Sequence, residues 1–207
     1  MTLTKKITLA LGFIAAALAS HAQTASTGAA PVGVLGQRYA EVSFEMQEID
    51  FVSPNLYSAN LSANLPVTPS LDLTGNYGYG RIRGNVRGHS NTVGAIATAY
   101  TALNGVKPFA SAGLGYQWTR FAGFDDDAGF WGVAVGVEIP VGAFAVTPRI
   151  AYVDDFEGGS SEQITYEVEG NYWFSTSSAL FAKVGKTDVR DSRVDSWNYE
   201  VGVRVKF

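Results

Sequence analysis

The sequence has no cysteine, few charged residues and little histidine, and each shortage excludes a class of protein. Without cysteine, the 207-residue chain is neither a disulfide scaffold nor a lipoprotein anchored through a thiol. Lys and Arg total 15 and the formal net charge is −4, which argues against a nucleic-acid partner. Charged residues make up 16% and hydrophobic residues 46% of the chain, a composition that excludes intrinsic disorder.

After residue 22, no stretch of the sequence approaches the ~18 consecutive apolar residues of a transmembrane helix. At the start, Lys5 and Lys6 precede an uncharged stretch over residues 7–19, followed by Ser20 and Ala22. This order is typical of a secretory signal peptide that is cleaved after Ala22. We therefore expect a signal peptide at 1–22, a flexible lead rich in small residues at 23–36, and one folded domain at 37–207.

Alternation of apolar and polar residues dominates the folded part. It is clearest at the C-terminus, where Trp197, Tyr199, Val201, Val203, Val205 and Phe207 alternate with polar residues or glycine. Strands in soluble sandwiches average about 5–6 residues, whereas about 9–11 tilted residues cross a bilayer. Similar segments recur about ten times, or eight if residues 55–65 are irregular and another segment merges. The pattern predicts an all-β fold, an antiparallel up-and-down transmembrane β-barrel of about ten strands.

The predicted connections alternate between tight turns and longer polar loops. Tight turns are predicted at residues 66–69, 103–106, 140–142 and 175–177, as on the periplasmic side of such barrels. The longer loops, including residues 121–127, would face outward. Aromatic residues at strand ends predict two girdles at the lipid interfaces, formed by Tyr39, Tyr57, Tyr79, Tyr116, Trp118, Trp131, Tyr152, Tyr172, Phe174, Trp197 and Phe207.

Together with the export signal and the alternating strands, the last residues carry a family resemblance. The chain resembles the small outer-membrane β-barrels of Gram-negative bacteria, of the OmpA and OmpX type. In that family a terminal phenylalanine, preceded by apolar residues at alternate positions, is the signal for barrel assembly, and the matching residues here are Tyr199, Val201, Val203, Val205 and Phe207. The resemblance implies an outer-membrane location, contact with lipid and lipopolysaccharide, periplasmic chaperones and the barrel-assembly machinery as partners, and a monomer.

Strand parity places a set of charged residues inside the predicted barrel. The candidate lumenal network consists of Glu41, Glu45, Asp72, Glu138, Arg149, Glu167, Glu169, Lys183, Glu200 and Arg204, and Lys107 and Lys206 share their inward parity. Side chains nearly fill the interior of a small barrel, so opposite charges are expected to pair as a plug. The alternative is a narrow water-filled path with a slight preference for cations, because acids outnumber bases.

Two classes of barrel enzyme have motifs that can be sought in the sequence, and neither motif is present. A lipid A deacylase-like site needs His and Ser two residues apart, but His89 and Ser90 are adjacent and would face opposite sides. An omptin-like protease needs His beside Asp, and none of Asp125, Asp126 and Asp127 neighbours His89 in sequence. These three aspartates lack the ligand spacing of a calcium loop. We therefore expect a non-enzymatic barrel with short loops, without cofactor or metal, that serves envelope integrity or surface interaction. A small diffusion pore is the alternative, and a barrel enzyme, lipid A deacylase-like or omptin-like, is the least favoured reading.

Overall fold

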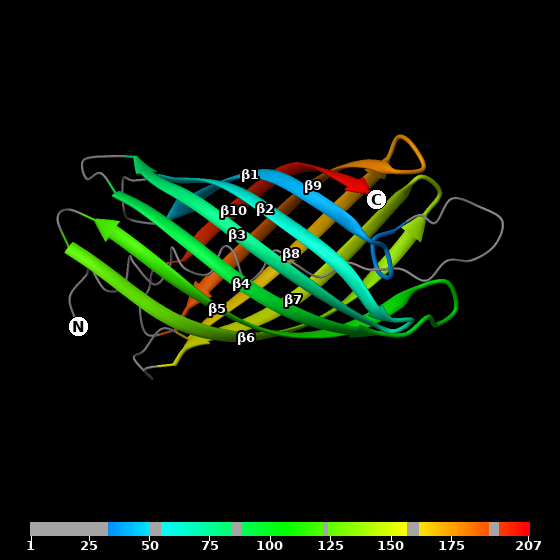
Figure 1. The fold of residues 1–207 in the computed structure, drawn as a ribbon, viewed down its shortest axis with the longest axis horizontal. Coiled ribbons are helices and arrows are strands. Elements are labelled where there is room, and N and C mark those ends of the chain that lie inside the picture. Colours follow the sequence, from blue (N-terminus) through cyan, green and yellow to red (C-terminus); the bar gives the residue numbers. More distant parts are fainter. Residues whose placement is uncertain (1–32, 50–54, 84–87, 122–123, 157–161, 191–194) are drawn as a thin grey trace.

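The computed structural model describes residues 33–49, 55–83, 88–121, 124–156, 162–190 and 195–207. The predicted signal peptide and most of the predicted lead lie outside these residues. Ten strands of the described chain form one closed antiparallel barrel in which each strand pairs with its neighbours in sequence (Figure 1). The predicted fold and strand number are confirmed, and the eight-strand alternative is wrong. The strands are β1 (Tyr39–Ile49), β2 (Asn55–Thr68), β3 (Leu71–Arg83), β4 (Gly88–Tyr100), β5 (Lys107–Phe121), β6 (Phe124–Val141), β7 (Phe144–Asp155), β8 (Gln163–Trp173), β9 (Ser178–Val189) and β10 (Ser196–Lys206).

The first and last strands close the barrel. β1 pairs with β10 in a register that sets Glu41 opposite Arg204 and Glu45 opposite Glu200. Four short connections and the end of β10 lie at one end of the barrel, on the right in Figure 1 and called the turn end from now on. One of them is closed by two backbone hydrogen bonds between Leu103 and Val106, of 2.8 and 3.0 Å. Tight turns at one end agree with the periplasmic side of an up-and-down barrel.

The barrel wall is inside out compared with that of a soluble protein. Outward positions are apolar and exposed: Val42 and Leu114 each keep 62% of their surface and Val201 keeps 59%. Most inward positions are polar and buried, such as Thr98 and Asn64, both fully buried. A continuous apolar outer band is unstable in water but matches the hydrocarbon core of a bilayer. The chain is therefore a transmembrane β-barrel. Among the described residues, no helix is long and apolar enough to cross a membrane.

Aromatic residues ring both ends of the outer surface. At the turn end the rings of Phe144 and Tyr172 stack with their centroids 4.8 Å apart. At the opposite end Trp131 packs against Tyr152 at 5.6 Å. One predicted member is wrong: Tyr39 is only 1% exposed and lies in the lumen, because it has the same strand parity as Glu41.

Lumenal glycines make room for rings that point inward. Phe181 on β9 lies directly against Gly202 on β10, and a Cβ atom added to this glycine would come within 2.5 Å of the ring. Phe130 is placed in the same way over Gly115. Small residues on one strand thus allow large ones on the next, and the lumen is filled without displacing the wall.

Most of the loop predicted at residues 121–127 is strand, since the described residues 121 and 124–127 all belong to β5 or β6. β5 runs to Phe121 and β6 starts at Phe124, so Asp125, Asp126 and Asp127 belong to a strand pair that is longer than the membrane requires. The prediction failed because consecutive aspartates are typical of loops. Beyond the bilayer, however, both faces of a hairpin meet water, and polar residues no longer mark its end.

Candidate functional site

All ten residues of the candidate network lie at inward positions of the barrel, but they form two groups. Eight lie on β1 and on the strands from β7 to β10 and are called the mid-lumen belt: Glu41, Glu45, Arg149, Glu167, Glu169, Lys183, Glu200 and Arg204. The other two, Asp72 and Glu138, lie at the turn end, where Lys107 joins them; these three are called the mouth cluster. Nearly all of these side chains are buried, from 0% exposure at Arg204, Asp72 and Glu138 to 13% at Lys107.

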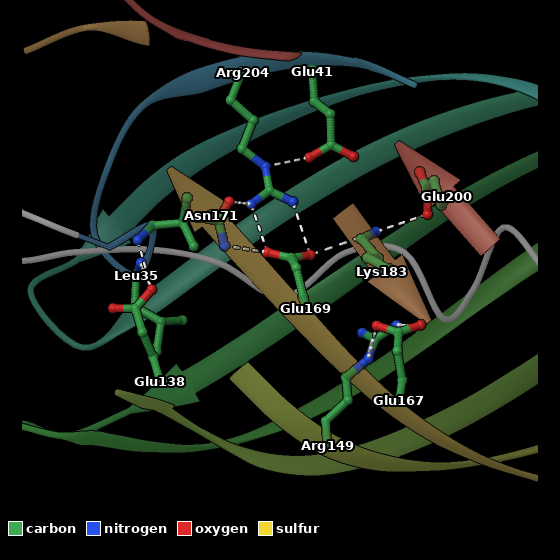
Figure 2. Close-up of polar contacts among 11 residues, drawn as sticks. Leu35, Glu41, Glu138, Arg149, Glu167, Glu169, Asn171, Lys183, Glu200 and Arg204 are labelled. Carbon is green, nitrogen blue, oxygen red and sulfur yellow. Dashed lines mark hydrogen bonds and ion pairs between the residues drawn. The ribbon is translucent and has the colours of Figure 1, made fainter. Parts of the chain in front are cut away.

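Arg204 is the centre of the mid-lumen belt (Figure 2). Its Nε donates to Glu41 Oε2 at 2.5 Å, while Nη1 and Nη2 donate to the two carboxylate oxygens of Glu169 at 2.6 and 3.0 Å. Nη1 also donates to Asn171 Oδ1. The register explains this reach: the β9 residue opposite Arg204 is the small Ala179, so the guanidinium passes over β9 to β8. The guanidinium thus links three strands: β10, β1 and β8.

The ring of Phe181 supports this guanidinium from one side. The Cζ atom of Arg204 lies 4.1 Å from the ring centroid, a cation–π distance. Gly202 opposite Phe181 leaves the space for the ring. A planar, delocalised cation suits this position because it bonds carboxylates in its plane and stacks across its face.

Lys183 and Arg149 complete the belt. The Nζ atom of Lys183 lies 3.0 Å from Glu200 and 3.7 Å from Glu169, its register neighbours on β10 and β8. Arg149 binds Glu167, its neighbour on β8, with Nε 2.9 Å from Oε1 and Nη2 3.1 Å from Oε2. Ion pairs thus connect β7, β8, β9, β10 and β1, which is the charged side of the lumen.

The other side of the lumen is neutral. Inward residues of β2 and β4 are uncharged; most are amides and hydroxyls, among them Asn60, Ser62, Thr92 and Thr98, and Leu56 and Ile96 are apolar. Asn60 links this side to the belt, because its Nδ2 donates to Glu45 Oε2 at 3.3 Å. With all groups ionised, five carboxylates of the belt face three cations. The lumen therefore combines one net-negative wall and one neutral wall.

The mouth cluster binds the backbone just before β1. Glu138 Oε2 accepts hydrogen bonds from the amide nitrogens of Val34 at 2.6 Å and Leu35 at 3.2 Å (Figure 2). Lys107 Nζ donates to the Leu35 carbonyl at 3.1 Å and lies 3.3 Å from Glu138 Oε1. Val34 and Leu35 were not among the predicted site residues; the signal in the sequence was an apolar pair between glycines in a lead of small residues.

The residues of the two enzyme motifs do not come together in the manner that catalysis requires. His89 faces outward at the rim, whereas Ser90 is buried on the lumenal side. In register, Arg120 lies between His89 on β4 and Asp125 on β6, and its Nε and Nη2 bind the Asp125 carboxylate at 2.6 and 2.9 Å. That carboxylate is therefore occupied by a guanidinium. In the described part of the chain, no three His, Asp or Glu side chains cluster to hold a metal ion.

The terminal residues of the predicted assembly signal line the outside of β10. Tyr199, Val201, Val203 and Val205 are between 41% and 59% exposed, and Phe207 is 69% exposed. The backbone amide of Phe207 donates to the carbonyl of Arg38 at 3.2 Å. This apolar row is available to lipid or to an assembly partner.

Comparison with known proteins gives the fold and no closer relative. No family model matches the chain, and no curated protein matches it. Among solved structures, the chain resembles the outer membrane protease OmpT from Escherichia coli, with a TM-score of 0.52 and 7% identity over 82% of this chain and 97% of that one. It also matches Neisserial surface protein A (TM-score 0.46, 18% identity, 82% and 96% coverage) and the KdgM porin (0.45, 12%, 81% and 99%). At these identities the likeness is one of fold, that of the outer-membrane β-barrels.

Proposed function

We propose that this protein is a non-enzymatic integral barrel of the outer membrane whose charged lumen is closed by its own side chains. The observation that carries the proposal is the fully buried Arg204 guanidinium, held inside the lumen by carboxylates from β1 and β8. A buried pair with complete hydrogen bonding is rigid, because loss of either partner strands a charge. Such a barrel serves envelope integrity or presents its outer rim to a partner.

The location follows from the outer surface and from the sequence. An apolar band between aromatic girdles fits a bilayer, and the predicted export signal fits the outer membrane of a Gram-negative cell. The partners we propose are lipid, lipopolysaccharide, periplasmic chaperones and the assembly machinery that reads the C-terminal strand. We propose a monomer, since a closed barrel leaves no strand edge for another subunit.

A small diffusion pore is the second candidate. The feature that favours it is the asymmetry of the lumen, with short neutral side chains on β2 and β4 facing a belt with two more carboxylates than it has cations. Ions passing along the neutral wall would meet this negative field, and cations would be preferred.

Recording of single channels in planar bilayers tests the proposal. We expect the refolded protein, shown to be inserted by its heat-dependent mobility on gels, to give no discrete conductance steps. Charge reversals at Glu167 and Glu169 serve as the comparison. Steps in the parent protein whose ion selectivity changes with these reversals would establish the pore instead.

A further inference from the structure

The segment Gly33–Gln37 enters the lumen at the turn end and is seated there in a pocket made by the barrel wall. Val34 and Leu35 are both 0% exposed. Leu35 clusters with Tyr100 and Phe109 from β4 and β5. Val34 clusters with Tyr39, Trp173 and Ala179 from β1, β8 and β9. Inward apolar and aromatic residues at this end of the lumen thus gather around two side chains of the preceding segment.

Charged and amide side chains hold the backbone of the same segment. Two consecutive amides donate to one carboxylate of Glu138, and the carbonyl of Leu35 accepts from Lys107. Asn64 on β2 donates from Nδ2 to the Gln37 carbonyl at 2.8 Å. Buried peptide groups need partners, and here the strand side chains provide charge-assisted ones. The wall therefore recognises both the side chains and the backbone of a short apolar peptide.

Glycines stand on both sides of the apolar pair. Gly33 has φ of 124° and Gly36 has φ of 90°, values that residues with a Cβ atom rarely adopt. The backbone can thus turn sharply before Val34 and after Leu35, and then leave the lumen to begin β1 at Tyr39.

We propose that residues Gly33–Gln37 are a built-in peptide plug that closes the periplasmic mouth of the lumen, and that their release opens it. This inference rests on the proposed function, a barrel with a closed lumen, and names the segment that closes it at the turn end. The site it assigns is a pocket for an apolar dipeptide with both amides bound by Glu138.

The absence of cysteine allows a direct test of the seat by thiol labelling. In the refolded protein, the thiol of a Leu35→Cys variant should react with a water-soluble maleimide at least about 100-fold more slowly than that of Leu103→Cys, a 56% exposed position at the same end. Adding Glu138→Gln should speed labelling at position 35 by about 10–100-fold, since a charge-assisted bond to two amides is weakened. Asp125→Asn, which neutralises a carboxylate at the far rim, should leave the rate unchanged.

Conductance then tests whether the plug closes the mouth. The changes Val34→Asp and Leu35→Asp are made in the Arg204→Ala variant, which lacks the central guanidinium of the mid-lumen belt. With folding checked by gel mobility, this triple variant should conduct more than Arg204→Ala alone. Equal labelling rates at positions 35 and 103 would refute the binding of the segment inside the lumen. Release of the segment without any rise in conductance would refute its role in closing the mouth. If the parent protein conducts while position 35 stays protected from labelling, the closed lumen of the proposed function is refuted, but the binding of the segment inside the barrel is supported.

Discussion

The Arg204→Ala substitution is expected to lower the free energy of unfolding by about 3–5 kcal/mol, the usual cost of removing one partner of a buried ion pair. Arg204 is 0% exposed, and the side chains of Glu41 and Glu169 are 3% and 1% exposed, so water cannot replace the lost donors without entering the belt. Glu169 keeps Lys183 at 3.7 Å, whereas Glu41 loses its donor at 2.5 Å. The loss should therefore come mainly from Glu41.

The origin of this loss can be separated from lost packing. In the double variant Arg204→Met, Glu41→Leu, the carboxylate that would be stranded is removed as well, and most of the stability should return. Arg204→Lys should recover less, because an ammonium group cannot reproduce the two parallel bonds to Glu169 or the stacking on Phe181.

Equilibrium unfolding by urea in lipid vesicles, followed by the fluorescence of the four tryptophans, measures these differences. Arg120→Ala is the matched control, because Arg120 also binds a carboxylate through two nitrogens but is 63% exposed. Its removal should change stability little, since exposed pairs contribute little. Equal losses for the two arginine variants would refute the reasoning from burial.

Two other substitutions test packing and assembly. Gly202→Ala should destabilise the barrel by about 1–3 kcal/mol through overpacking, because the added Cβ would lie 2.5 Å from the Phe181 ring and 2.6 Å from a backbone oxygen. The control is Gly170→Ala, which has open space around the added Cβ and should be neutral in the same unfolding assay. Deletion of Phe207 should leave refolding in detergent intact, since this side chain is 69% exposed, but should reduce the heat-modifiable form recovered from cell membranes. Normal insertion of the shortened chain in cells would argue against its role as an assembly signal.

Strand parity in the sequence was sufficient to predict the barrel and the inward position of its charges, because alternation in a strand requires no knowledge of the partner strand. From Trp197 to Lys206 each residue faces the side that alternation predicts. Tyr39 was misassigned because aromatic character at a strand end outweighed its parity with Glu41. The strand at residues 124–127 was missed because alternation has meaning only where one face meets lipid.

The pairing of the charges could not be predicted in the same way. Arg204 and Glu169 are 35 residues apart, and their contact depends on the small Ala179 between them and on the register of β8, β9 and β10. Parity gives the face of a residue but not its height in the lumen. The division into a mid-lumen belt and a mouth cluster is therefore a property of the register.

Pairing of β1 with β10 is also the step that completes the barrel during folding. The bond from Arg204 to Glu41 joins residues 163 positions apart, across the seam where the two ends of the chain meet. Before that seam forms, both outer strands have unpaired backbone groups and Glu41 has no guanidinium beside it. Pairing of β1 with β10 satisfies these backbone groups and the Glu41 carboxylate in one event. A chain in which β10 is not yet in place therefore has an open wall and an unpaired carboxylate in its interior, and the closed barrel has neither.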